Sequence, residues 1–124
     1  MPLTRDFKET IKARAQRDPA FRRALLREAI ETMLAGDLHT GKAVLRNYIN
    51  ATDGFGDLEA ATHKSAKSLM RMLGPDGNPQ AENLFEIVAY LQNKEGIRFE
   101  VRAARLSRSS AVQNTSAAPG EKSA

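Results

Sequence analysis

The stretch from Phe55 to Gln80 limits most strongly what this chain can fold into. Two short segments with helical periodicity, 55–62 and 66–73, are separated by a three-residue turn. A loop with two glycines and two prolines follows, from Gly74 to Pro79, and this density of turn residues fixes a tight connection. Helices this short are not stable alone. The sequence therefore predicts a helical hairpin that depends on packing against the rest of the chain.

The second helix of this hairpin is basic, and no acidic residue occurs from Lys64 to Gly74. Ser65 is a suitable N-cap, and Lys67 and Arg71 share one face because they are four residues apart. Short polar side chains beside basic ones suit the major groove of DNA, where arginine bonds guanine and lysine reaches guanine or phosphate. We therefore predict a helix-turn-helix; the alternative is an ordinary helical hairpin with a basic exposed face. The predicted DNA-binding residues are Lys64, Ser65, Ala66, Lys67, Ser68, Arg71 and Asn78.

Residues 1–53 are predicted to form helices that pack on the DNA-binding unit. Asp18 and Pro19 are an N-cap followed by proline at the first helical position, and Asp37 is a second N-cap. Gly36 is expected to end the helix before it in a left-handed conformation, and Gly41 suggests close helix packing. The three predicted helices span residues 4–17, 19–35 and 37–52.

A last helix completes the helix-turn-helix core, which we place over residues 54–96. Asn78 is predicted to be its N-cap, with Pro79 at the first helical position. Apolar residues at helical spacing continue to about Lys94, and Gly96 closes the helix.

The segment from Ile97 to Arg102 alternates strictly between apolar and charged residues, which predicts one β-strand within 97–106. A single strand needs a pairing partner. That partner is the same strand of a second copy, a different protein, or another segment of this chain. The final residues, 107–124, are rich in Ser, Ala and other small or polar residues and are predicted to be a disordered tail.

Composition excludes several classes of function. The chain has 124 residues, a net charge of +4 and a pI near 9.7, which mildly favours an acidic partner such as nucleic acid. It contains no cysteine and two histidines, and no triad or phosphate-loop arrangement is present. We therefore expect no enzyme activity, no metal and no cofactor. No signal peptide or membrane segment is predicted, and we expect a cytoplasmic protein.

Residues 54–92 resemble the helix-turn-helix domain of Xre/Cro-like bacterial regulators, and more narrowly the probable addiction module antidote branch. The resemblance is carried by Leu58, the run from Lys64 to Leu73, the loop from Gly74 to Pro79 and the run from Asn83 to Ile87. It implies a mainly α, lambda-repressor-like helix-turn-helix bundle. It also implies an antitoxin that dimerises, represses its own promoter and neutralises a partner toxin, often a ribosome-dependent endoribonuclease.

Two positions depart from the pattern of that branch. Many members have glycine in the turn where this chain has His63, and alanine where it has Glu59. Histidine can adopt the left-handed conformation at some cost, and Glu59 must point outward or be paired. The main alternative function is a protein-interaction module that neutralises a small toxin, with DNA binding secondary or absent.

Overall fold

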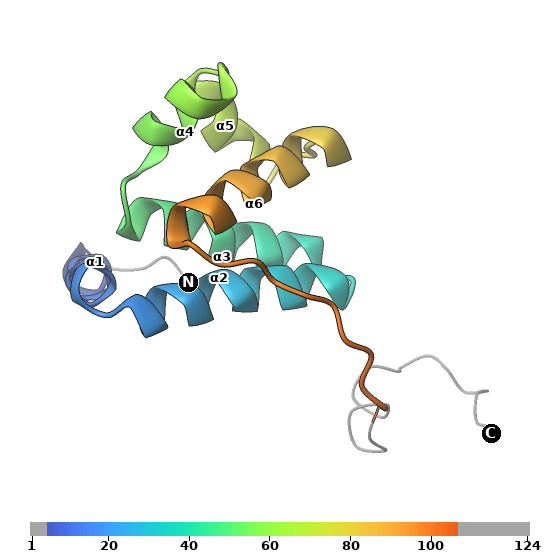
Figure 1. The fold of residues 1–124 in the computed structure, drawn as a ribbon. Coiled ribbons are helices and arrows are strands. Elements are labelled where there is room, and N and C mark those ends of the chain that lie inside the picture. Colours follow the sequence, from blue (N-terminus) through green and yellow to red (C-terminus); the bar gives the residue numbers. More distant parts are fainter. Residues whose placement is uncertain (1–4, 107–124) are drawn as a thin grey trace.

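The computed structural model describes residues 5–106 and places six helices in that range (Figure 1). They are α1 (Arg5–Arg17), α2 (Pro19–Leu34), α3 (Leu38–Ala51), α4 (Phe55–Thr62), α5 (Ala66–Met72) and α6 (Ala81–Glu95). The prediction of a mainly helical bundle is confirmed. The predicted disordered tail lies outside the described residues.

The helices form two layers. The antiparallel pair α2 and α3 makes one layer, with α1 across one end of it, and α4, α5 and α6 make the other (Figure 1). The core lies between the layers because each helix turns its apolar stripe inward. Its largest fully buried side chains are Leu26, Leu45, Tyr48, Ile49, Leu58, Leu69, Leu73 and Ile87.

Local sequence signals set the boundaries of α2 and α3 as predicted. The Asp18 carboxylate accepts a hydrogen bond from the Phe21 amide at 3.2 Å, and Asp37 accepts one from the Thr40 amide at 3.1 Å. Gly36 follows α2 with a φ of +98°, which confirms the expected left-handed residue. These caps satisfy backbone groups that have no partner inside the helix.

Gly41 lets α2 and α3 approach closely. A Cβ atom at this position would lie 2.4 Å from Cγ of Met33 and 3.1 Å from the carbonyl oxygen of Ala29, both in α2. A glycine inside a helix costs about 1 kcal/mol relative to alanine. The close contact of the two helices explains why the chain tolerates that cost here.

A buried carboxylate, Glu95 at the end of α6, joins the two layers. Its side chain is 4% exposed, and Nε of Arg22 in α2 donates to it at 2.9 Å, while the hydroxyl of Tyr48 in α3 donates to the same oxygen. Burial alone would raise the pKa of Glu95, but the hydrogen bonds from Arg22 and Tyr48 outweigh it and leave the pKa below its ordinary value. Arg22 also donates to the carbonyl of Ala15 at 2.8 Å, so one acid links α1, α2, α3 and α6.

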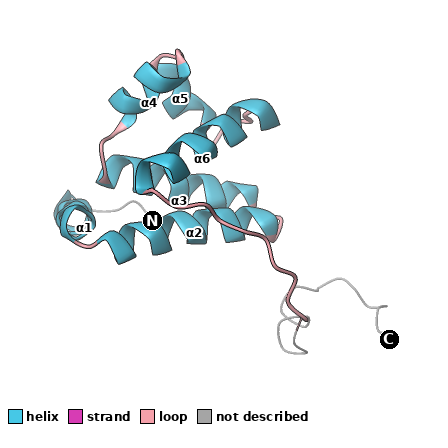
Figure 2. Cartoon of the chain, viewed as in Figure 1, coloured by secondary structure: helices cyan, strands magenta, loops and turns pink. Residues whose placement is uncertain are grey.

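The predicted strand is absent, and this prediction is wrong for the described residues. The whole segment 97–106 has no regular secondary structure, and Figure 2 shows no strand within residues 5–106. A strand needs a backbone partner, and no described segment lies beside this one to supply it. Instead, Ile97 and Phe99 turn their amides toward Gln92 of α6. Within residues 5–106 of one chain, the alternation therefore places Ile97 and Phe99 against the helices without forming a sheet.

The start of α6 is also displaced from its predicted position. Gln80 is the N-cap and Ala81 the first helical residue, two residues later than the prediction from Asn78 and Pro79. The side chain of Lys42 holds the carbonyls of Gly74 and Gly77, so the chain crosses this side of α3 before it turns into a helix. The other end agrees with prediction, because Gly96 closes α6 with a φ of +72°.

Candidate nucleic-acid interface

The predicted hairpin of two short helices is present. Helix α4 ends at Thr62, and His63 follows it in the left-handed region with a φ of +61°. The His63 amide donates to the carbonyl of Glu59 at 3.0 Å. Histidine therefore occupies the position that glycine often holds, at a small conformational cost. The turn places α5 directly after α4 and across the top of the fold (Figure 1).

Two side chains cap the first turn of α5. Ser65 Oγ accepts a hydrogen bond from the Ser68 amide at 3.0 Å, as predicted for an N-cap. Glu59, which reaches over from α4, accepts one from the Ala66 amide at 3.2 Å. Glu59 is exposed, so it does not disturb the interface between α4 and α5. Its departure from alanine is compensated by a favourable acid at a helix N-terminus.

The other end of α5 is held by two cations from α3. The ammonium of Lys42, whose residue is 4% exposed, donates to the carbonyl of Gly74 at 3.0 Å and also to that of Gly77. One turn later, the guanidinium of Arg46 donates to the carbonyl of Leu73. The last carbonyls of a helix lack partners and carry partial negative charge. Arg46 therefore satisfies the carbonyl of the C-cap residue Leu73, while Lys42 bonds two carbonyls of the following loop, and both attach this end of α5 to α3.

Gly77 allows the loop to close against the end of α5. A Cβ atom there would lie 2.2 Å from the carbonyl oxygen of Arg71 and 2.4 Å from that of Met72. Both are backbone atoms, which cannot move aside as a flexible side chain can. The loop that was predicted from its glycines and prolines is thus shaped by one close backbone contact and by the Lys42 ammonium.

Lys67 and Arg71 occupy the outer surface of α5. Both residues are exposed, and four-residue spacing in a helix puts them on one face. No described residue forms an ion pair or a hydrogen bond with either charged group. Two cations on one face of α5 are therefore available to bind an external anion.

The remaining predicted DNA-binding residues are less available for contact with DNA than Lys67 and Arg71. The ammonium of Lys64 pairs with Glu86 of α6 at 3.2 Å. Ser65 uses its hydroxyl for the cap, and Ser68 is half-buried. Ala66 packs against the core, and Asn78 is exposed in the loop. The structure therefore brings the predicted set together on and around α5, but it reduces the exposed basic part to Lys67 and Arg71.

Sequence reasoning missed Lys42 and Arg46, which position α5. Their only sequence signal is a Lys-x-x-x-Arg spacing in an otherwise apolar helix face. Such a lysine is almost never buried unless it is paired. Its partners are backbone carbonyls more than 30 residues away, which no local pattern identifies.

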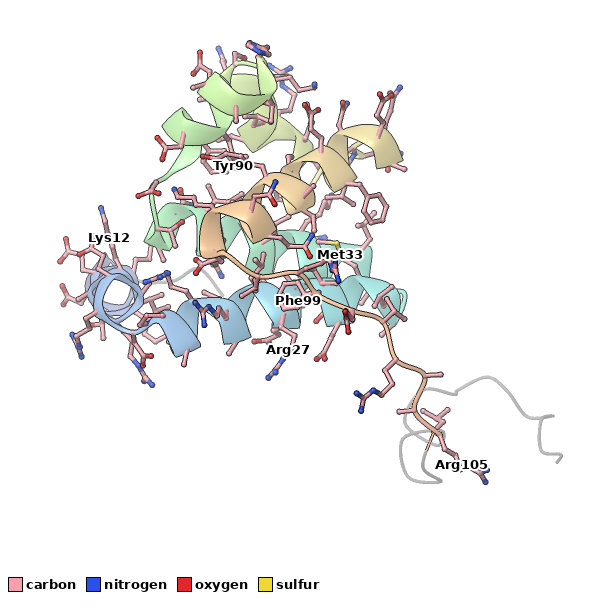
Figure 3. The ribbon with its side chains drawn as sticks, viewed as in Figure 1. Lys12, Arg27, Met33, Tyr90, Phe99 and Arg105 are labelled. Atoms are coloured by element: carbon pink, nitrogen blue, oxygen red, sulfur yellow. The ribbon has the colours of Figure 1, made fainter. Side chains whose placement is uncertain are left out.

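A separate groove of about 540 Å³ runs between α1 and α3. Its lining combines the apolar residues Ile11 and Ala51 with Lys8, Glu9 and Lys12 of α1 and Asn47 and Asn50 of α3. Lys12 points away from the bundle in Figure 3.

Within residues 5–106, no group of three side chains could hold a metal ion, and no helix is long and apolar enough to cross a bilayer.

Comparisons with protein-family models, with curated proteins and with solved structures gave no significant match. The resemblance to Xre/Cro-like regulators of the antidote branch therefore stays a prediction.

Proposed function

We propose that this chain is a DNA-binding transcriptional regulator of the antitoxin type, which represses its own promoter as a dimer in the cytoplasm. The observation that carries the proposal is the exposed pair Lys67 and Arg71 on α5, a helix whose two ends are fixed. Exposed cations on one helix face supply the phosphate neutralisation on which DNA affinity depends. A fixed helix can present them to base edges without a further ordering cost.

The roles of individual residues follow from their surroundings. Arg71 can bond a guanine edge with two hydrogen bonds, and Lys67 can reach guanine or phosphate. Lys64 is a phosphate ligand once it leaves Glu86, at a small cost because exposed ion pairs are worth about 0–1 kcal/mol. A dimer would place its two α5 helices about 34 Å apart, one turn of DNA.

A gel-shift assay with the DNA upstream of the chain's own gene tests this proposal, with a scrambled duplex as control. The Lys67→Ala, Arg71→Ala double variant is expected to bind about 100-fold more weakly, because a bidentate base contact is worth about 1–3 kcal/mol. The matched control is Lys8→Ala, Lys12→Ala, which removes two exposed cations at the same spacing from α1. Equal affinity of the two double variants would rule out α5 as the DNA-binding helix.

A second candidate function is neutralisation of a small toxin, with DNA binding secondary or absent. The groove between α1 and α3, with its mixture of acid, base and amide side chains, favours it. The test is co-purification with the product of a neighbouring small gene, repeated with the Lys8→Ala, Lys12→Ala variant. If no such partner co-purifies, the antitoxin role fails while the repressor role survives.

A further inference from the structure

The segment after α6 runs as an extended chain with two different faces. Phe99 packs against the core, and Ile97 is half-buried. In contrast, the side chains of Arg98 and Glu100 are 81% and 77% exposed, and they form an ion pair with each other at 3.2 Å that would exchange for the cross-strand pairs in a dimer. Figure 3 shows Phe99 over the helices while the chain continues to Arg105 away from them. This alternation is that of a strand with one face on the protein and one in solvent.

The backbone of this segment also has two different edges. The Ile97 amide donates to the carbonyl of Gln92 at 3.1 Å, and the Phe99 amide donates to the Gln92 side chain at 2.7 Å. In extended backbone, the amides of alternate residues point to one edge and the intervening amides to the other. The amides of Arg98 and Glu100 therefore point to the opposite edge, where no described residue bonds to them.

We propose that this free edge pairs with the same edge of a second copy, antiparallel, about a two-fold axis at Phe99. Arg98 and Glu100 then form the hydrogen-bonded pairs of the ladder, because their amides point outward. Phe99 faces its own equivalent, and Ile97 faces Val101 of the second copy. This inference rests on the proposed function in one respect: the role of the dimer would be to place two α5 helices on DNA.

Charge complementarity selects this partner and this register. With the axis at Phe99, each Arg98 faces Glu100 of the other copy, so both cross-strand pairs are of opposite charge, which is favourable. A shift that puts the axis at Glu100 would bring two glutamates together and set Arg98 against Arg102, and like charges in this position are unfavourable. An axis at Val101 would place the charged Arg105 opposite Ile97. Only the Phe99 register matches charge with opposite charge and apolar with apolar.

Exposed apolar surface beside the edge supports the same partner. Val101 is 86% exposed and Leu34 is 69% exposed. Both line a hollow of about 270 Å³ between α2 and this segment, together with Ile30 and Phe99. In the proposed dimer, Ile97 of the second copy lies beside Val101 and reduces this exposure. An isologous contact of this kind closes as a dimer and does not extend into a fibre.

Sedimentation equilibrium of the full chain, without DNA, tests the proposal through two charge reversals. In Arg98→Glu each cross-strand pair becomes two glutamates, and in Glu100→Arg each becomes two arginines. We expect about tenfold weaker self-association in each, since each such pair contributes about 0.2–1 kcal/mol. An equimolar mixture of the two variants pairs glutamate with arginine throughout, so the heterodimer is expected to regain wild-type affinity. Arg102→Glu, which has no partner in this register, is the control.

The proposal is overturned if the wild-type chain is monomeric, if neither single reversal weakens association, or if the mixture fails to regain it. A loss in Arg102→Glu equal to that in Arg98→Glu would overturn the register. Because these positions are exposed, circular dichroism is expected to show unchanged helix content in every variant. A dimer that forms as predicted but does not bind the upstream DNA would leave this inference standing and refute only the proposed function.

Discussion

Two Lys-x-x-x-Arg pairs lie wholly within helices of this chain, and their surroundings differ. Lys42 and Arg46 in α3 turn inward and donate to carbonyls at the end of α5 and in the loop after it. Lys67 and Arg71 in α5 are exposed, and no described residue binds their charged groups. The two pairs have the same residue types and the same spacing. What separates them is the set of groups that the fold brings near them.

This difference assigns stability to one pair and binding to the other. A buried cation is tolerated only when its donors are satisfied, so the hydrogen bonds of Lys42 contribute to the stability of the fold. Two exposed cations four residues apart on a helix destabilise it slightly, by about 0.2–0.5 kcal/mol, and Lys67 and Arg71 are accessible to a ligand. Substitutions at the two pairs should therefore change different observables, and this can be tested at each pair in turn.

The largest effect is expected at Lys42. Lys42→Met keeps most of the volume but leaves the carbonyls of Gly74 and Gly77 without their donor. Each unsatisfied buried group costs about 1–3 kcal/mol, so the free energy of unfolding should fall by about 3 kcal/mol. Urea denaturation measures it, with Lys67→Met as the matched control, which should change stability by less than about 0.5 kcal/mol. Equal losses in both variants would contradict the contrast between the pairs.

Gly77→Ala should have the next largest effect. The new Cβ would meet backbone carbonyls of Arg71 and Met72 at 2.2 Å and 2.4 Å, so the loop must move away from the end of α5 and from Lys42. Overpacking of this kind costs about 1–3 kcal/mol. Thermal unfolding compared with Gly56→Ala, whose Cβ would meet nothing within 4 Å, isolates the contact. A Gly77→Ala protein as stable as the wild type would show that the loop is not closed on α5.

The stabilisation that the buried carboxylate of Glu95 provides is expected to depend on pH. The pKa of Glu95 is lowered from 4.5 in the folded chain, so its ion pair stabilises the protein above that pH. The stabilisation is lost as the pH falls below 4.5 and through the folded pKa. Glu95→Gln should therefore be less stable than wild type at pH 7, and the difference should shrink in acid. A difference that stays constant down to pH 3 would contradict the assigned ion pair with Arg22.

The smallest effect is expected at Glu86, which forms an ion pair with Lys64, the third cation near α5. Glu86→Gln releases Lys64 from its 3.2 Å ion pair and removes a negative charge beside the proposed interface. Upstream DNA should then bind about two- to fivefold more tightly, in keeping with about 0–1 kcal/mol for an exposed pair. Fluorescence anisotropy can resolve this change. Weaker binding by Glu86→Gln would place the DNA away from Lys64.

Features set by neighbours in the sequence could be predicted well. The caps at Asp18, Asp37 and Ser65 and the helix ends at Gly36 and Gly96 follow from local hydrogen bonding and backbone freedom. Such signals need only three or four residues of context, and the helices that they bound were predicted to within a few residues.

Features that depend on distant groups could not be predicted in this way. The alternation from Ile97 to Arg102 resembles a strand, but α6 supplies the bonds that a neighbouring strand would have made. The start of α6 moved because Lys42 reaches the loop from α3. Near the candidate site, the shared exposed face of Lys67 and Arg71 was predicted from their spacing, but the burial of Lys42 was not, because burial and not residue type distinguishes the two lysines.

The most direct test of the central claim is the salt dependence of binding to the upstream DNA. The logarithm of the affinity falls with the logarithm of salt concentration by about 0.9 per phosphate contact. The account predicts that Lys67→Ala, Arg71→Ala lowers the magnitude of this slope by about 1–2 relative to wild type, with the urea midpoint unchanged. An unchanged slope together with an unchanged affinity in the variant would show that DNA does not contact this face of α5, and it would contradict the account.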